Sequence, residues 1–200
     1  MKNREFLIKI LLMLRSKGIN NEKVLFSVEK IPPHYFLYLL GDKKGFQDIN
    51  FEELDRLLKI LQDTLLYKNR ISNVLISEFK LGWFFSISSL LAKRIYGLCA
   101  DKKTINKAEK AYNYLGLSNI FIKKGSNLLD WSQVAPFDLI VIFKSYTSLP
   151  HQYLDLLTKD GLLFFTKENK DKVSIMKCNK DKKIQKLKVK DFYLEENIIL

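Results

Sequence analysis

Residues 137–143 read FDLIVIF, and six of these seven residues are apolar. An apolar run that fills both faces of a strand is typical of a strand buried inside a parallel sheet. Four further short apolar runs follow this pattern: NVLIS (73–77), IYGLC (95–99), NIFI (119–122) and GLLFF (161–165). Helix-length segments separate the runs. This alternation predicts an α/β fold with a central parallel sheet covered by helices on each side.

The N-terminal third of the chain has a helical pattern instead. Apolar residues recur at helical spacing in three segments: 3–17, about 21–30 and 51–66. Asn20 or Asn21 can cap the second of these helices, which should end before Pro32 because proline disfavours helical geometry in the residue before it. The glycine-containing stretch 41–50 is expected to form a loop.

The last 35 residues lose the helical period. VSIMKC (173–178) and KIQKLKVKDFYL (183–194) suit an antiparallel strand pair at the edge of the sheet. The chain contains no internal repeat and no low-complexity linker. We therefore expect a single domain over 1–200, with a helical N-terminal extension over 1–70 and an α/β core over 71–200.

Composition excludes several classes of protein. A hydrophobic fraction of 47% with 12% aromatic residues is typical of a globular domain and excludes disordered and collagen-like chains. The net charge of +12 raises the possibility of a nucleic-acid or anionic partner. However, the ten lysines within 167–190 have no arginine or aromatic residue among them. Such lysines favour the solvated face of an edge strand, so nucleic acid is not the favoured partner.

The cysteines and the N-terminus indicate a cytoplasmic protein. Cys99 and Cys178 allow at most one disulfide, which favours a reducing compartment. Glu5 and Lys9 interrupt the N-terminal apolar run, so it does not read as a signal peptide. The sequence contains no apolar run long enough to span a membrane and no cysteine or histidine spacing typical of a metal site. We expect no metal and no membrane partner.

Three segments look like parts of a known family. RSKGINNEKVLFSVEKIPPHYF (15–36) resembles the N-terminal segment of protein-L-isoaspartate O-methyltransferases, with a helix, a Gly-Ile turn, a second helix and a Val-Pro-Arg-x-x-Phe element. AYNYLGLSNIFIKKG (111–125) is similar to that family's helix, Leu-Gly-x-x-Asn turn and third strand, and APFDLIVI (135–142) to its fourth strand. The resemblance extends in order from about 15 to 170.

The resemblance implies the Rossmann-like sheet of S-adenosylmethionine-dependent methyltransferases, with seven strands in the order 3-2-1-4-5-7-6 and the seventh antiparallel. Ligands of such sheets bind outside the carboxyl ends of the strands. The implied activity is protein repair by transfer of a methyl group from S-adenosylmethionine to isoaspartyl carboxyls. Damaged proteins or peptides would then be the substrates.

The glycine-rich turn after the first strand departs from the family pattern Val-Leu-Glu-Ile-Gly-x-Gly-x-Gly-Tyr. The aligned residues here are VLISEFKLGW (74–83), which keep only the third glycine, Gly82. Glu78 and Lys80 stand at the other two glycine positions. Their side chains would occupy cofactor volume, or they form an ion pair that fills the vacated space.

The strand-end carboxylates of the family are also replaced. The acidic residue that holds the ribose aligns with Cys99, although Asp101 lies two positions later. The Gly-Asp-Gly that reads the adenine aligns with Gly125-Ser126-Asn127, which puts a hydroxyl where the family has a carboxylate. Cys99 has no histidine nearby in the sequence and is interpreted as a packed thiol.

The substrate-binding segment departs as well. The family's Gln-Thr-x-Ser-x-Pro element should fall at 48–60, where this chain reads DINFEELDRLLKI, and its Thr-Ala-Ala element is replaced by Phe143-Lys144-Ser145. No catalytic residue and no metal ligand is assigned. The candidate cofactor-binding residues are Ser77, Glu78, Gly82, Asp101 and Ser126, although helix–strand packing is the favoured interpretation of Gly82.

Two hypotheses for the function remain. The chain is either an isoaspartyl methyltransferase that uses S-adenosylmethionine, or a catalytically inactive protein of the same fold that binds or interacts with another molecule and needs no cofactor. A basic nucleic-acid binder is the less favoured form of the second hypothesis.

Overall fold

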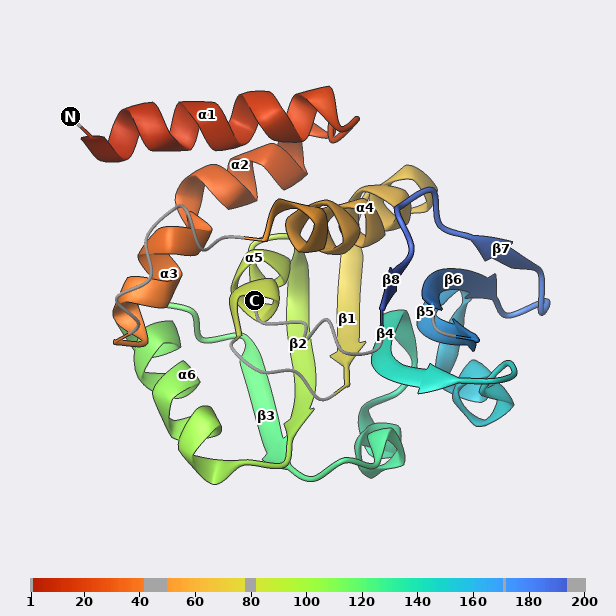
Figure 1. Cartoon of the computed structure of the whole chain (residues 1–200). Helices are drawn as coiled ribbons and strands as arrows, with labels where there is room; N and C mark the ends of the chain where they lie inside the picture. Colours follow the sequence, from red (N-terminus) through yellow and green to blue (C-terminus); the bar gives the residue numbers. More distant parts are fainter. Residues whose placement is uncertain (1, 42–49, 78–81, 171, 194–200) are drawn as a thin grey trace.

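The chain is described by a computed structural model that covers residues 2–41, 50–77, 82–170 and 172–193. The helices are α1 (Lys2–Ser16), α2 (Glu22–Lys30), α3 (Pro33–Leu39), α4 (Phe51–Tyr67), α5 (Trp83–Ser89) and α6 (Lys102–Tyr114). The strands are β1 (Ile71–Ile76), β2 (Ala92–Cys99), β3 (Ile120–Lys124), β4 (Phe137–Tyr146), β5 (Leu157–Asn169), β6 (Lys172–Asn179), β7 (Ile184–Lys186) and β8 (Phe192–Tyr193). Figure 1 shows their arrangement.

The three predicted N-terminal helices are confirmed as α1, α2 and α4. Asparagine caps two of them, since the side chain of Asn21 accepts hydrogen bonds at the start of α2 and that of Asn50 at the start of α4. The short helix α3 was not predicted. It begins at Pro33, because proline is well suited to the first position of a helix although it ends the one before. The predicted loop at 41–50 falls mostly on 42–49, outside the described residues.

The predicted α/β fold with a Rossmann-like sheet is confirmed. The strand order is β3-β2-β1-β4-β5-β6-β7, with β8 paired to β6. The first five of these strands are parallel, and β1 lies at the centre between β2 and β4. The run at 73–77 is therefore the central strand, as predicted.

The predicted order 3-2-1-4-5-7-6 is wrong in its last two strands. Only residues 170 and 171 separate β5 from β6, which is too short a connection for a crossover, so β6 pairs with β5 as an antiparallel hairpin. The next strand, β7, then pairs with the outer edge of β6. The prediction of an antiparallel strand pair at this edge is confirmed.

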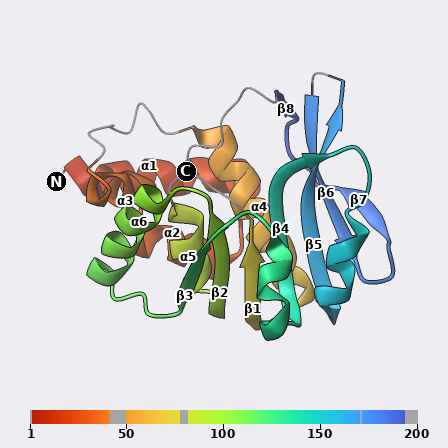
Figure 2. The same ribbon diagram turned by 90° about the horizontal axis from the view of Figure 1, so that it is seen from below.

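The two faces of the sheet are covered differently. Each of the described helices α1 to α6 contributes buried residues to the apolar core on one face. The core on the other face is completed by two short 3₁₀ helices, η2 (Leu128–Val134) and η3 (His151–Leu156). Helices on both faces were predicted, and on the second face the described residues form 3₁₀ helices in place of α-helices. The strands β4 and β5 are longer than predicted and leave only 147–156 to connect them (Figure 2).

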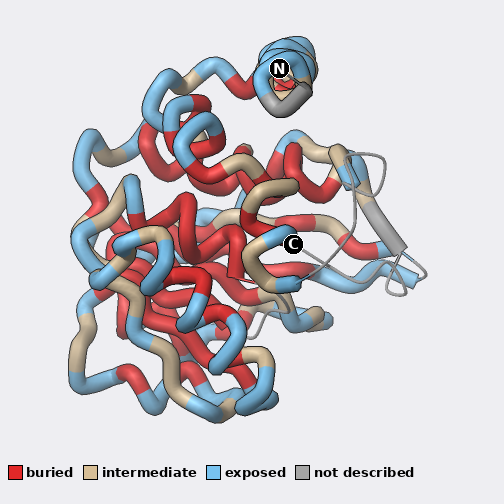
Figure 3. Tube along the Cα trace, turned by 90° about the vertical axis from the view of Figure 1, so that its left-hand side faces the viewer, coloured by how far each residue is buried: buried red, intermediate tan, exposed pale blue. Residues whose placement is uncertain are grey.

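The N-terminal helices share one core with the sheet. Leu14 of α1 and Leu61 of α4 belong to the same buried cluster as Val74 of β1 and Leu139 of β4, and all four side chains are at most 1% exposed. Figure 3 shows buried stretches gathered in the middle of the molecule and exposed stretches around them. Within the described residues, no helix is both long and apolar enough to cross a membrane.

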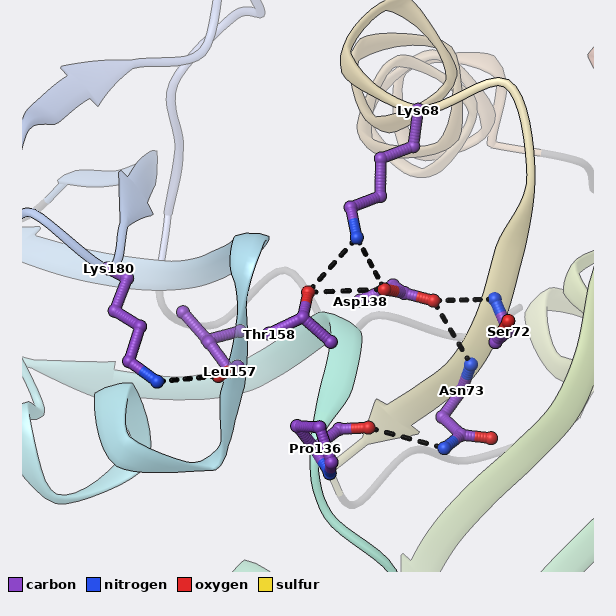
Figure 4. A network of polar contacts seen from close by, with 8 residues as sticks. All are labelled: Lys68, Ser72, Asn73, Pro136, Asp138, Leu157, Thr158 and Lys180. Carbon is purple, nitrogen blue, oxygen red and sulfur yellow. Dashed lines mark hydrogen bonds and ion pairs between the residues drawn. The ribbon is translucent and has the colours of Figure 1, made fainter.

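A buried carboxylate joins four elements at the start of β4 (Figure 4). One oxygen of Asp138 accepts hydrogen bonds from Lys68 Nζ at 2.5 Å and Thr158 Oγ1 at 3.1 Å. The other oxygen accepts from the backbone nitrogens of Ser72 at 2.6 Å and Asn73 at 3.4 Å. Because Asp138 is only 6% exposed, these four donors replace the water that its charge has lost.

We predict that Asp138→Asn destabilises the protein by about 3 kcal/mol, because it leaves Lys68 without its counter-charge and turns an amide donor toward backbone donors. Asp160→Asn is a matched control, since Asp160 is exposed and has no polar partner among the described residues. Urea unfolding at pH 7 measures both variants. Equal stability of Asp138→Asn and the unchanged protein would show that the carboxylate contributes nothing.

The same carboxylate should make stability dependent on pH. Burial alone would raise the pKa of Asp138, but the hydrogen bonds from Lys68 and the Ser72 amide lower it overall. A lowered pKa stabilises the fold above the carboxyl's ordinary pKa of about 4, and this stabilisation disappears as the pH falls through the folded value. We therefore expect the difference in unfolding free energy between the unchanged protein and Asp138→Asn to be constant above about pH 5 and to shrink at lower pH.

The shared core predicts that residues 1–70 and 71–200 unfold together. A chain of residues 71–200 alone would expose the helix-covered face of the sheet and is expected to lack a cooperative thermal transition. Circular dichroism melting of this fragment and of the whole chain is the measurement. A fragment that melts cooperatively near the temperature of the whole chain would establish two independent units.

Candidate functional site

The carboxyl ends of the central strands meet at one edge of the sheet. Ile76 of β1 pairs in register with Gly97 of β2 and with Val141 of β4, and Gly97 pairs with Ile122 of β3. The residues that follow each of these strands therefore lie at the same edge. This is the edge at which open parallel sheets bind their ligands.

Ser77 connects β1 to β4 at this edge. Its backbone nitrogen donates to Val141 O at 2.8 Å, and its hydroxyl oxygen accepts from Phe143 N at 2.9 Å. The side chain is buried, so its first role is to hold the two strand ends together. The next candidate, Glu78, and its neighbour Lys80 lie outside the described residues.

Gly82 is enclosed by side chains of the protein. Its φ of 86° lies in the left-handed region, and a Cβ atom placed on it would lie 2.3 Å from the hydroxyl oxygen of Tyr112. That hydroxyl donates to Gly82 O at 3.3 Å, and the Tyr112 ring stacks on Phe36 with 6.2 Å between centroids. Burial raises the pKa of Tyr112, so the phenol stays neutral. The space beside Gly82 is filled by α3 and α6.

Asp101 caps helix α6. Its carboxylate accepts hydrogen bonds from the backbone nitrogens of Lys103 at 3.1 Å and Thr104 at 2.9 Å, and from the Thr104 hydroxyl at 2.7 Å. These bonds, led by the one from the Thr104 hydroxyl, lower the pKa of Asp101. The side chain is exposed to solvent, but three of its acceptor positions serve the helix.

Cys99 ends β2 as a buried thiol. It is 6% exposed, and its Sγ donates to Asp101 O at 3.6 Å. Cys99 O accepts from Gly125 N at 3.1 Å, which fixes the turn after β3 against the end of β2. Ser126, the residue after this glycine, is exposed.

Four of the five candidate residues are thus placed by the structure, three of them on consecutive turns at this edge and Gly82 inside the helical layer.

Both tryptophans are part of the core. Trp83 is fully buried and donates from Nε1 to Ile31 O at 2.7 Å. Trp131 is 7% exposed, donates to Gly97 O at 3.0 Å and packs on Tyr96. The role of Tyr112 could not be predicted from local sequence, because Tyr112 is thirty residues from the glycine that it contacts.

The histidines are far apart and differ in environment. His34 stacks on Phe6 with 5.7 Å between ring centroids, and burial lowers its pKa. His151 is exposed at the start of η3. Across the described ranges, no three His, Cys, Asp or Glu side chains are close enough together to hold a metal ion.

Comparison with known proteins agrees with this architecture. A 26% identical relative from Dictyoglomus turgidum, a protein-L-isoaspartate O-methyltransferase, matches over 167 residues, which cover 80% of this chain and 74% of the relative. A relative of the same name from Parvibaculum lavamentivorans is 24% identical over 163 residues, 78% of this chain and 73% of its own.

A solved structure has the same fold. It is described as a protein-L-isoaspartate O-methyltransferase from Plasmodium falciparum in complex with S-adenosyl-L-homocysteine, and it superimposes with a TM-score of 0.67 over 92% of this chain and 93% of its own. Its sequence identity is 15%, so this likeness concerns the fold alone.

The model of one family matches residues 90–194, just over half of the chain, and this stretch contains the strand ends at Cys99 and Ser126 described above. The family is named protein-L-isoaspartate(D-aspartate) O-methyltransferase. The family model matches more than half of this chain, the relatives match most of the chain's length, and β1 lies at the centre of the sheet. This chain therefore belongs to the protein-L-isoaspartate(D-aspartate) O-methyltransferase family.

Proposed function

We propose that this chain is a non-catalytic member of its family, which keeps the methyltransferase fold, has exchanged the contacts that hold S-adenosylmethionine, and works by binding another molecule. The observation that carries this proposal is the chemistry of the strand ends. A buried thiol, Cys99, and an exposed hydroxyl, Ser126, stand where the family resemblance expects carboxylates. Along the chain, the nearest described carboxylate to Cys99 is that of Asp101, which caps α6. The nearest to Ser126 is that of Asp130, whose Oδ2 would lie 3.5 Å from a Cβ placed on Gly125.

These residues do not fit the cofactor in the family's manner. A neutral thiol or hydroxyl forms weaker hydrogen bonds than a carboxylate to a ribose diol or an adenine amine. Each lost charged hydrogen bond is worth about 1.5–3 kcal/mol, so two of them weaken binding about a hundredfold or more.

The glycine that remains supports the same proposal. Because Gly82 has no Cβ, Tyr112 and Phe36 can pack directly against its backbone, in the space that a Cβ would occupy. Packing within the protein thus accounts for a glycine at this position without any ligand.

The substrate side supports it too. Residues 51–60, where the family's substrate segment should fall, belong to α4 and contribute buried leucines to the core. After β4 the family's loop is replaced by a continued strand, in which Ser145 pairs in register with Thr166 of β5, and Thr166 Oγ1 donates to Phe143 O at 3.2 Å. Backbone that is paired in a sheet is less available to close over a substrate.

A second candidate function is methyl transfer to isoaspartyl carboxyls of damaged proteins. The observation that favours it is the extent of the family match, which spans β2, β3 and β4 in sequence and the whole sheet in fold. In this candidate, Glu78 or Asp101 supplies the ribose contact, and S-adenosylmethionine supplies the methyl group when bound.

Calorimetry with S-adenosylhomocysteine separates the two candidates. For the whole chain at micromolar concentrations we expect no heat of binding, because two charged contacts are missing. Binding in the low micromolar range would contradict the non-catalytic proposal and favour the enzyme. An assay with an isoaspartyl peptide and cofactor labelled on its methyl group is the second arm, with ester formation no higher than the blank as the expected result.

A single substitution should recover part of the lost affinity. We predict that Ser126→Asp strengthens binding of S-adenosylhomocysteine about tenfold, because it returns a charged acceptor to the turn after β3. Ser118→Asp is the matched control, since Ser118 is also exposed but precedes β3 at the opposite edge of the sheet. Ligand-detected NMR at millimolar S-adenosylhomocysteine measures both. Equal binding by the two variants would show that Ser126 does not face the cofactor.

A further inference from the structure

A cavity of about 700 Å³ opens at the amino edge of the sheet, opposite the edge discussed above. It lies among α1, α2, the end of α4 and the first residues of β1 and β2, elements that Figure 1 shows together at one end of the strands. Its volume falls within the range of about 300–1,000 Å³ that is usual for small-molecule sites. The cavity is therefore large enough for a ligand that makes no contact with the carboxyl edge.

The interior of this amino-edge cavity is apolar. Leu25, Leu65 and Ile71 line it and are at most 7% exposed, so they form a fixed hydrophobic surface contributed by α2, α4 and β1. Two larger apolar side chains lining it are exposed to solvent, Phe26 at 54% and Leu90 at 41%. An open apolar surface of this kind gains free energy when an apolar ligand covers it.

The charged residues that line the cavity leave two cations without partners. Arg15 is paired with Glu22 at 3.1 Å, and Lys23 Nζ donates to Asn69 O at 3.1 Å. The side chains of Arg70 and Lys93, in contrast, form no hydrogen bond or ion pair with any residue that the structure describes. They lie at the starts of adjacent strands, two register positions apart, because Arg70 precedes Ile71, Lys93 follows Ala92, and Ile71 and Ala92 are register partners.

The net charge of the cavity lining favours a ligand of negative charge. The lining contains four cations against two acidic residues, Glu22 and Glu29, so its net charge is +2. Glu29 is the one acidic residue of the lining that has no cation paired with it among the described residues. Two unpaired cations on adjacent strand ends outweigh this single acid and favour an anionic head group.

We propose that this cavity binds a single-chain amphiphile with an anionic head, of the fatty carboxylate class. The apolar chain covers Leu25, Leu65 and Ile71, and the carboxylate lies at Arg70 and Lys93. The site is separate from the carboxyl edge, so the proposal does not depend on which of the two candidate functions the family site performs.

The first test compares head groups on the whole chain. Calorimetry uses dodecanoate below its micelle-forming concentration and dodecan-1-ol, which has the same chain without the charge. We expect dodecanoate to bind and dodecan-1-ol to bind about tenfold more weakly, since the two cations stabilise only the bound carboxylate. No binding of dodecanoate, or equal binding of the two, would overturn the proposal.

The second test removes the cations. Arg70→Gln with Lys93→Gln should weaken dodecanoate about tenfold and leave dodecan-1-ol unchanged. The matched control is Lys182→Gln with Lys183→Gln, which removes the same charge from an exposed turn between β6 and β7 and should leave both ligands unchanged. Equal weakening by the two pairs would mean that net charge alone attracts the anion, and would overturn the proposed site.

The third test fills the cavity and identifies the source of the ligand. Ala92→Phe places a large side chain in the lining and should abolish binding of both ligands, with thermal melting used to confirm that the variant is folded.

Sedimentation with phosphatidylglycerol vesicles distinguishes a free carboxylate from a lipid surface. Binding to vesicles that Ala92→Phe and the Arg70–Lys93 pair leave unchanged, with no binding of free dodecanoate, would overturn the proposal.

Discussion

The buried carboxylate of Asp138 is the constraint on which the arrangement of the sheet depends. Its two oxygens take four donors from three separate parts of the chain: Lys68 after α4, the backbone at the start of β1, and Thr158 in β5. A charge buried to this extent is tolerated only when all of these donors are in place at once. The carboxylate therefore fixes α4, β1, β4 and β5 relative to one another, and with them the strand register that defines both edges of the sheet.

The unequal covering of the two faces follows from this frame. On one face, the N-terminal helices complete a core that reaches from Leu14 to Leu139. On the other face, the connections on either side of β4 are short, and 3₁₀ helices with Trp131 and Leu154 close the core instead. The helical extension is consequently part of the packing of the sheet. Side chains from this helical layer fill the space beside Gly82, where Tyr112 and Phe36 pack against its backbone.

The two edges of the sheet differ in how their residues are used. At the carboxyl edge, the residues are used by the protein itself: Ser77 joins two strands, Asp101 caps a helix and Cys99 is buried. At the amino edge, the helical extension and the strand starts line an apolar cavity, in which two cations have no side-chain partner among the described residues. A family fold can keep its stability through such a change, because stability resides in the core and function in the groups placed at its edges.

The sequence by itself determined the strand-forming runs, the asparagine-capped helices and the family, because these depend on local periodicity, capping and ordered motifs. It also predicts, from the aligned positions, that Cys99 and Ser126 stand where the family resemblance expects carboxylates. Only the tertiary structure decided that β6 lies directly beside β5, that η2 and η3 cover the second face, and that Tyr112 closes over Gly82. These features depend on the lengths of strands and on contacts between residues far apart in the chain, for which local sequence carries no signal.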